Sequence, residues 1–184
     1  MLAWVGHAMQ HFPAPWFVAG GWALDLFEGA NVRPHGDVDI AILRRDQARL
    51  FDALPHWSFR KAADGELRRW SKSEYLRPPL HEIHARCADL HLEFLLNECD
   101  HAFWLYRRNT AVTLPLENLG VMSSNGIPYL APEVVLLYKA QAPRAADESD
   151  FRRIAPLLRP PARAWLAAAL NVCHPGHAWS KALH

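Results

Sequence analysis

The chain has 184 residues, about half of them hydrophobic, with 20 basic and 19 acidic side chains. This length fits one domain, or one domain with a small helical appendage, and no apolar run approaches the length of a membrane span. A net charge near zero argues against broad electrostatic binding of nucleic acid, which requires a basic surface that displaces counterions from phosphate groups.

The N-terminal segment and the cysteines both favour a cytoplasmic location. Residues 1–12 lack the basic start and the long apolar stretch of a signal peptide, and a short amphipathic helix is expected over 3–10. The three cysteines are widely spaced and form no Cys-x-x-Cys pair. They are therefore expected to be reduced packing residues: Cys87, Cys99 and Cys173.

A glycine pair follows the first predicted strand, at residues 16–19. Gly20 and Gly21 open a segment with helical spacing over 22–28. A glycine turn at the start of a helix exposes backbone N–H groups and the positive end of the helix dipole, where a phosphate can bind. Taken alone, such a pair more often marks an ordinary strand-to-helix turn.

Two acids begin the next predicted strand. Asp37 and Asp39 precede or start the short β-branched segment 38–43. Because side chains at positions i and i+2 of a strand share a face, we expect both carboxylates to project together. Adjacent carboxylates repel each other unless a cation lies between them, and oxygen ligands suit Mg²⁺. The alternative is a solvated strand end whose acids face water.

Together these residues resemble the nucleotidyltransferase superfamily, and especially small aminoglycoside 2''-adenylyltransferase-like and lincosamide nucleotidyltransferase-like proteins. The resemblance rests on the glycine turn and the acids in order: Gly20-Gly21-Trp22-Ala23-Leu24-Asp25, Gly29, Arg33, His35 and Asp37-Val38-Asp39-Ile40. It implies an α+β fold, a polymerase-beta-like mixed sheet flanked by helices. It also implies that the glycine turn holds a triphosphate, that the acids bind Mg²⁺ and that a neighbouring strand supplies a third acid.

The middle of the chain predicts a helix over 46–54 and a hairpin, 57–62 and 66–70, around the turn dipeptide Asp64-Gly65. A loop with two prolines then leads to residues 80–87, which are expected to form a strand. A zinc site is the less favoured alternative there, because the spacing of its possible ligands matches no familiar zinc motif: His81, His84, Cys87 and His91.

Glu93 lies inside the predicted apolar strand 90–97, on the face opposite Leu92 and Phe94. A carboxylate in such a strand is costly unless it is paired or bound to metal; alternatively, it faces solvent from an edge strand. The resemblance aligns residues 89–93 with the strand that supplies the third acid. Relatives usually have aspartate there, so Glu93 is the candidate and Asp89 the fallback.

The C-terminal half predicts strands over 103–107 and 119–129, with a hairpin turn at Asn125-Gly126. Helices are expected over 133–140, 145–158 and 162–171, followed by an irregular tail. We therefore divide the chain into a nucleotidyltransferase core, 1–130, and a C-terminal helical segment packed on it, 131–184.

Lys139 occupies a position where the resemblance places a lysine. It either contacts the triphosphate as a point charge or complements the C-terminal end of its helix. Ala146 stands where relatives commonly have a second lysine, which leaves that loop less basic. Asp147 and Asp150 are expected to be acids at a helix start and not catalytic groups.

The predicted function is a Mg²⁺-dependent nucleotidyltransferase that moves AMP from ATP, a nucleoside triphosphate, to a hydroxyl of a small molecule such as an aminoglycoside-like antibiotic. Asp37 and Asp39 would hold the metal, and Glu93 would act as general base or third ligand. Arg33 and His35 would contact the nucleotide or hold the loop in place. A cationic acceptor would require further acids, and candidates are available: Glu28, Glu66, Glu74, Glu98 and Asp100.

Three alternatives remain from the sequence. One is a nucleotidyltransferase that modifies a protein or tRNA, as in toxin–antitoxin pairs. Another is a non-catalytic descendant that binds nucleotide or a partner protein. The last is a plain α/β interaction domain, in which the glycines and acids would occur in this order by chance.

Overall fold

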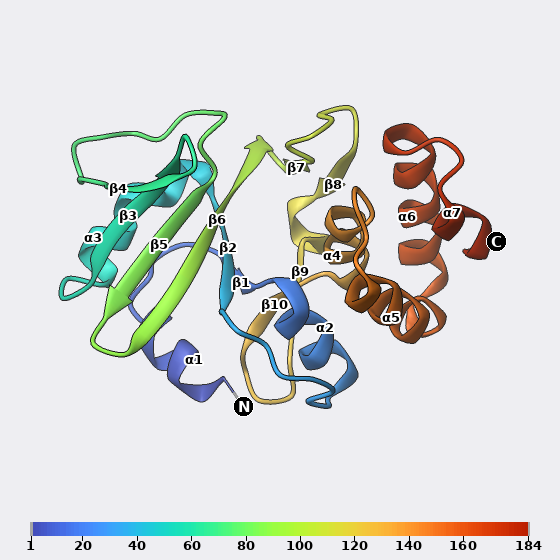
Figure 1. The fold of residues 1–184 in the computed structure, drawn as a ribbon, viewed down its shortest axis with the longest axis horizontal. Coiled ribbons are helices and arrows are strands. Elements are labelled where there is room, and N and C mark those ends of the chain that lie inside the picture. Colours follow the sequence, from blue (N-terminus) through green and yellow to red (C-terminus); the bar gives the residue numbers. More distant parts are fainter. Residues whose placement is uncertain (1, 184) are drawn as a thin grey trace.

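The computed structural model describes residues 2–183 and shows a mixed β-sheet with helices packed against it (Figure 1). Eight strands are hydrogen-bonded in the order β4-β3-β5-β6-β2-β1-β10-β9, and β7 and β8 extend from the far end of β6. The strands are β1 Trp16–Val18, β2 Asp39–Leu43, β3 Ser58–Ala63, β4 Glu66–Arg69, β5 Glu82–Cys87, β6 Leu90–Asp100, β7 Phe103–Leu105, β8 Thr113–Pro115, β9 Gly120–Met122 and β10 Pro128–Leu130.

The helices complete the α+β fold that the sequence predicts. They are α1 Ala3–Met9, α2 Gly20–Glu28, α3 Leu50–Ala53, α4 Pro132–Lys139, α5 Ala145–Ile154, α6 Pro160–Cys173 and α7 Ala178–Ala182. In Figure 1 the hairpin strands β3 to β6 lie on one side of the molecule and helices α4 to α7 on the other. Between residues 2 and 183, no helix is both long and apolar enough to cross a bilayer.

The centre of the sheet positions the candidate site. Strand β2 lies between β1, to which it runs antiparallel, and β6, to which it runs parallel. Ile40 and Ile42 of β2 are almost fully buried, as are Leu92 and Phe94 of β6. Because both strands are fixed by this core, the polar residues at their starts are held in a fixed register.

One continuous hydrophobic core joins the sheet to the C-terminal helices. Leu130 at the end of β10 and Leu136 of α4 belong to it, as does Leu170 of α6. Helix α2 packs against α4 and α5, and α4 packs against α6. The division of the chain at residue 130 stays a prediction, and buried side chains connect the two sides of it.

Most predicted elements appear with shifted ends. Helix α2 begins at Gly20 and not at residue 22, and the predicted helix 46–54 is a 3₁₀ segment, Arg44–Arg49, followed by α3. The predicted helix 145–158 ends at Ile154 and is followed by a 3₁₀ turn. Pro160 starts α6, since the first helical turn does not require the N–H group that proline lacks.

One strand and one α-helix were not predicted. The short strand β8 pairs with β7. The tail, expected to be irregular, contains α7, whose Trp179 is buried and stacks on Phe151 of α5 with ring centroids 4.3 Å apart. A tertiary contact therefore orders a segment whose polar, glycine- and proline-containing sequence predicts a loop.

Candidate active site

Gly20 brings the start of α2 against the carboxylate of Asp39. Its φ angle is +61°, and a Cβ atom added there would lie 2.2 Å from Asp39 Oδ2. The neighbouring Ala19 N–H donates a hydrogen bond to the backbone oxygen of Asp39 at 2.8 Å. Glycine is therefore required both by the left-handed backbone and by the close approach of the acid.

Gly21 allows a second close approach, to the loop that precedes β2. A Cβ atom there would lie 2.3 Å from His35 Cε1 and 2.8 Å from Arg33 Nη2. His35 is buried, and its Nε2 lies 2.8 Å from Asp25 Oδ2. Arg33 pairs with Asp150 at 3.4 Å. Both side chains thus hold the loop under α2, which is the structural role that the sequence left open for them.

Asp37, Asp39 and Glu93 lie at the starts of the two central strands. Asp39 and Glu93 are Cα partners across the parallel pair β2–β6. Asp37 lies in the bend just before β2, with its side chain 58% exposed, and the strand begins at Asp39, one residue later than the predicted segment 38–43. Asp89, the fallback, is exposed in the turn between β5 and β6, so Glu93 is the acid that faces Asp39.

Burial and mutual repulsion perturb these acids. Burial, together with the negative charges of Glu93 and Asp37, raises the pKa of Asp39 to about 6. Burial also raises the pKa of Glu93, against the opposing effect of His84. Three carboxylates so placed are stabilised by a bound cation, which lowers both their repulsion and their proton affinity.

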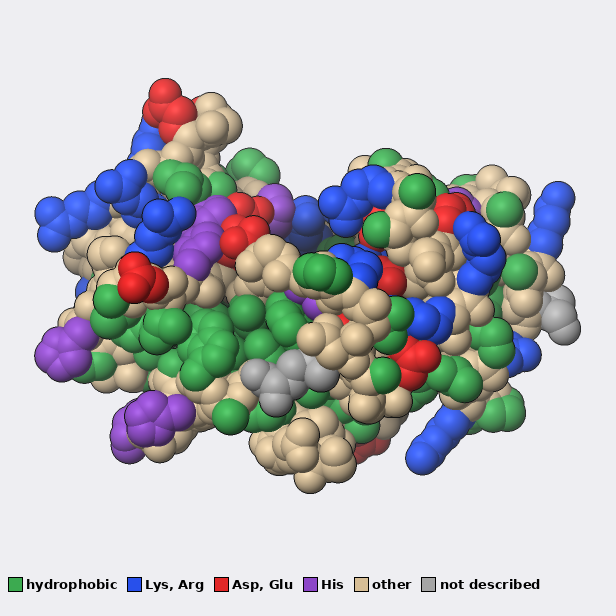
Figure 2. All heavy atoms as spheres, turned by 60° about the horizontal axis from the view of Figure 1, so that its bottom comes forward, with side chains coloured by type: hydrophobic (Ala, Val, Ile, Leu, Met, Phe, Trp, Pro, Cys, Tyr) green, Lys and Arg blue, Asp and Glu red, His purple; other side chains and the backbone are tan. Residues whose placement is uncertain are grey.

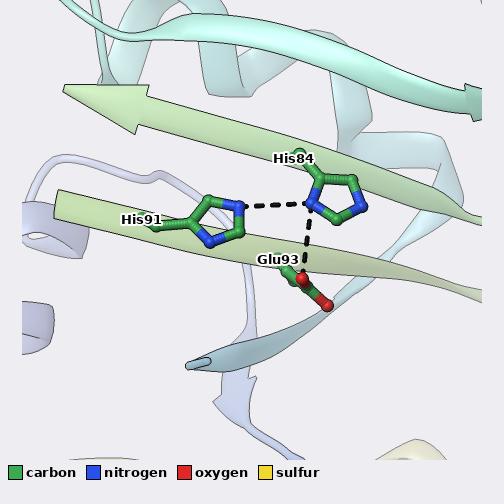
Figure 3. Close-up of side chains that lie close together, drawn as sticks. All are labelled: His84, His91 and Glu93. Carbon is green, nitrogen blue, oxygen red and sulfur yellow. Dashed lines mark hydrogen bonds and ion pairs between the residues drawn. The ribbon is translucent and has the colours of Figure 1, made fainter. Parts of the chain in front are cut away.

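Two histidines adjoin the acids, and sequence reasoning did not connect them to the site. His84 of β5 is the cross-strand partner of Glu93, with its Nδ1 3.3 Å from Glu93 Oε1. His91 stacks on His84, with ring centroids 5.3 Å apart, as Figure 3 shows. His91 Nδ1 also lies 3.3 Å from Asp37 Oδ1. Pairing residues 82–87 with residues 90–95 in the correct register would have placed His84 opposite Glu93.

A pocket of about 390 Å³ opens beside Gly20, between the sheet and the loop joining α4 to α5. Cationic side chains line it: Arg107, Arg108, Lys139 and Arg144. The ring of Tyr138 also lines it, and the guanidinium of Arg108 lies 5.3 Å from that ring's centroid. Figure 2 shows basic side chains on one side of a hollow and histidine and acidic side chains on the other.

Lys139 lies in this pocket and pairs with two acids of α5. Its Nζ lies 3.0 Å from Asp150 Oδ2 and also bonds Asp147. Burial by itself raises the pKa of Asp147, but hydrogen bonds from Arg144 and Lys139 outweigh it and hold that pKa below its usual range. Asp147 also caps the start of α5, as predicted for a helix-start acid. The charge of Lys139 reaches Asp39 too, where it opposes the rise in pKa.

Asp25 is a further residue whose role the sequence did not indicate. It is 1% exposed and accepts hydrogen bonds from the Val32 N–H, at 3.2 Å, and from Arg153 of α5. With its bond to His35, these contacts tie α2 to the loop and to α5. Asp25 therefore stabilises the position of α2, the helix that begins at the glycine turn.

The acids considered for a cationic acceptor are not gathered around the pocket. Each is paired with a nearby basic or histidine side chain: Glu28 with Arg153, Glu66 with Arg68, Glu74 with Lys61, Glu98 with Arg44, and Asp100 with His101. The acids that do line the pocket are Glu82 of β5 and Asp147 of α5, and Asp147 is already paired with Lys139 and Arg144. The negative charge near the site therefore comes from β5, β6 and the start of β2.

Solved structures with similar folds are nucleotidyltransferases. The structure of ANT(2")-Ia in complex with adenylyl-2"-tobramycin has a TM-score of 0.60 and 15% identity, covering 90% of this chain and 92% of that one. The lincomycin-bound lincosamide adenylyltransferase LnuA has a TM-score of 0.58 and 14% identity, covering 85% and 96%. An antigenic nucleotidyltransferase-like protein from Paracoccidioides brasiliensis has a TM-score of 0.50 and 19% identity, covering 99% and 89%.

At these identities the structures establish a shared fold. No curated protein matches by sequence. The family model described as aminoglycoside-2''-adenylyltransferase matches residues 1–154, which include the glycine turn, the three acids and all the lining residues of the pocket. The sequence resemblance and the α+β fold are thus confirmed. The chain belongs to the aminoglycoside-2''-adenylyltransferase family of nucleotidyltransferase enzymes.

Proposed function

We propose that the protein transfers AMP from ATP to a hydroxyl group of a small-molecule acceptor, in a reaction that depends on Mg²⁺. The observation that carries this proposal is the register of β2 and β6, which sets Asp39 opposite Glu93 next to the Gly20 turn. Acids and an anion-binding helix start are thereby within reach of one phosphate group.

The acids fit a Mg²⁺ site. Asp37 and Asp39 offer oxygen ligands, Glu93 a third, and burial with mutual repulsion raises the pKa of Asp39 to about 6. Such a group favours a bound cation at neutral pH. When bound, Mg²⁺ supplies charge neutralisation for the triphosphate and polarises the α-phosphate.

The basic pocket fits the nucleotide. The N–H groups at Gly20 and Gly21 begin a nine-residue helix, and they suit the β- and γ-phosphates. Lys139 and Arg144 line the same pocket and add positive charge. Arg33 and His35 contribute by holding the loop beneath the glycines, where Arg33 pairs with Asp150 and His35 with Asp25.

Glu93 is the proposed general base. It takes the proton of the acceptor hydroxyl as that oxygen forms its bond to the α-phosphorus, while the bond from this phosphorus to the leaving pyrophosphate breaks. Burial raises the pKa of Glu93, which makes its carboxylate a stronger base than an ordinary one. His84 Nδ1 lies 3.3 Å from Glu93 Oε1 and stabilises the proton that Glu93 takes up.

We propose an aminoglycoside-like antibiotic as the acceptor and the cytoplasm as the location. The family description supports this choice, as do the adenylyl-2"-tobramycin and the lincomycin bound in two structures of similar fold. Asp37, Glu82 and Glu93 place negative charge on the β5–β6 side of the site, where Glu82 also lines the pocket. A polycationic acceptor is attracted to that side.

The test is product formation by mass spectrometry. The protein is incubated with Mg²⁺, each nucleoside triphosphate and a pool of aminoglycosides and lincosamides. An acceptor heavier by one nucleoside monophosphate, absent with Asp39→Asn, supports the proposal and names both substrates. Metal-dependent triphosphate binding without a modified drug would overturn the antibiotic acceptor in favour of a protein or tRNA. Absence of triphosphate binding would indicate a non-catalytic descendant.

A further inference from the structure

The histidine pair beside the acids has a hydrogen-bonding pattern that needs a cation. His84 Nε2 lies 2.6 Å from Glu82 Oε1. An ionised carboxylate can only accept hydrogen bonds, so Nε2 carries the proton and donates it. In a neutral ring this leaves a lone pair on Nδ1, the nitrogen that faces the site.

The same argument applies to His91. Its Nδ1 lies 3.3 Å from Asp37 Oδ1, so that nitrogen is the donor and Nε2 carries the lone pair. His84 Nδ1 and His91 Nε2 are 3.2 Å apart. Two lone pairs therefore face each other, and Glu93 Oε1, 3.3 Å from His84 Nδ1, completes a group of three acceptors (Figure 3).

The spacing of this group is that of a metal site. A tetrahedral ion with bonds of 2.0–2.1 Å sets its ligand atoms about 3.3 Å apart. The three atoms lie within 4.8 Å of one another, and two of their separations are 3.2 and 3.3 Å. His81 and Cys87, the other residues considered for zinc, are not part of the group.

We propose that His84, His91 and Glu93 bind a divalent transition metal of the Zn²⁺ class, at a site that adjoins the Mg²⁺ site and shares Glu93 with it. Imidazole nitrogens favour Zn²⁺ over Mg²⁺, which prefers oxygen ligands. The carboxylates of Glu82 and Asp37 orient the two rings from outside, as in many zinc sites. Three protein ligands leave one position open to water or to a substrate oxygen.

The test measures metal binding without substrates, so it stands apart from the proposed transfer activity. Calorimetry with Zn²⁺ alone, on metal-free protein, is expected to show one site. Co²⁺ alone is expected to give the strong visible absorption of a tetrahedral ion. His84→Gln and His91→Gln should each weaken Zn²⁺ binding at least about tenfold, and Glu82→Gln about 10–100-fold.

Two controls separate this site from its neighbours. Asp39→Asn removes a ligand of the proposed Mg²⁺ site and should change Zn²⁺ affinity by less than about threefold, since Asp39 lies outside the histidine group. His101→Gln removes a histidine whose side chain is 96% exposed, and it should leave the Zn²⁺ affinity unchanged. Circular dichroism confirms that each variant is folded.

Loss of Zn²⁺ binding in Asp39→Asn with retention in both histidine variants would overturn the proposal, since the ion would then bind to the aspartates. Absence of Zn²⁺ and Co²⁺ binding by the folded wild-type protein would also overturn it. In that case the two histidines share a proton, which is the other cation able to satisfy facing lone pairs.

Discussion

Asp39 and Glu93 are direct partners across the parallel strands β2 and β6, and the charge of Glu93 raises the proton affinity of Asp39. Strand pairing alone fixes this relationship, because each residue is followed along its strand by side chains locked in the core. The metal-free site is therefore under electrostatic strain at neutral pH, and binding of a cation relieves it.

The raised pKa of Asp39 makes the stability of the protein depend on pH and metal together. The folded pKa of about 6 exceeds the ordinary value of 3.8, so the folded state binds the proton more tightly. The resulting stabilisation is present below pH 3.8 and is lost as pH rises through 6, a change on the order of 3 kcal/mol. We expect Mg²⁺ to stabilise the protein more at pH 7.5 than at pH 5.

Urea unfolding at both pH values, with and without Mg²⁺, measures this effect. Asp39→Asn is the control, because it removes the titrating group and retains the shape of the side chain. Its stability should depend less on pH, and Mg²⁺ should stabilise it little. Equal stabilisation of the wild-type protein by Mg²⁺ at pH 5 and pH 7.5 would contradict the role given to Asp39.

The roles proposed for Asp39 and Glu93 predict different kinetic defects. Asp39→Asn should lose Mg²⁺-dependent ATP binding together with transfer. Glu93→Gln should retain ATP binding and lower kcat by about 10²-fold or more, the range for removal of a general base. Asp89→Asn, in the turn before β6, should behave as wild type. If Glu93→Gln instead raised the KM for ATP with little change in kcat, Glu93 would be a binding group and not the base.

Gly20→Ala should damage the site more than the fold. The new Cβ atom would lie 2.2 Å from Asp39 Oδ2, at a φ angle of +61°. We expect loss of Mg²⁺-dependent ATP binding as well as about 1–2 kcal/mol of stability. Gly29→Ala is a matched control, since its φ is +75° and a Cβ atom there meets nothing within 4 Å. The control should show the same loss of stability, measured by urea unfolding, and normal ATP binding.

Equal loss of ATP binding in the two glycine variants would show that backbone strain, and not the contact with Asp39, disables the site.

The sequence predicted those parts of the site that depend on one strand at a time. Alternation along residues 90–97 placed Glu93 opposite the core face, and the β-branched run after Asp39 predicted its strand. Side-chain contacts between two different elements were not predicted. His84 faces Glu93 only because of the register of β5 on β6, which alternation in a single strand does not fix.

Long-range ion pairs escaped for the same reason. Asp25 binds Arg153, 128 residues further along the chain, and Arg33 binds Asp150. Local sequence indicates a helix start for the acids of α5 and says nothing of a partner in α2 or its following loop. The C-terminal tail shows the effect most clearly, since its order depends on a contact with α5.

Trp179 tests whether that tail is an integral part of the fold. The family match ends at residue 154, and Trp179 lies beyond it while stacking on Phe151 within it. Its indole Nε1 also donates a hydrogen bond to Glu148 at 3.0 Å. Trp179→Ala should lower the free energy of unfolding by about 3–5 kcal/mol, as for other buried aromatic truncations. Trp179→Phe retains a stacking ring and loses the hydrogen bond, so its cost should be smaller. Urea unfolding of the three proteins is the test. Unchanged midpoints would mean that α7 does not pack on α5 in solution. A graded loss of stability would show that the tail stabilises α5, the helix that carries Asp147 and Asp150.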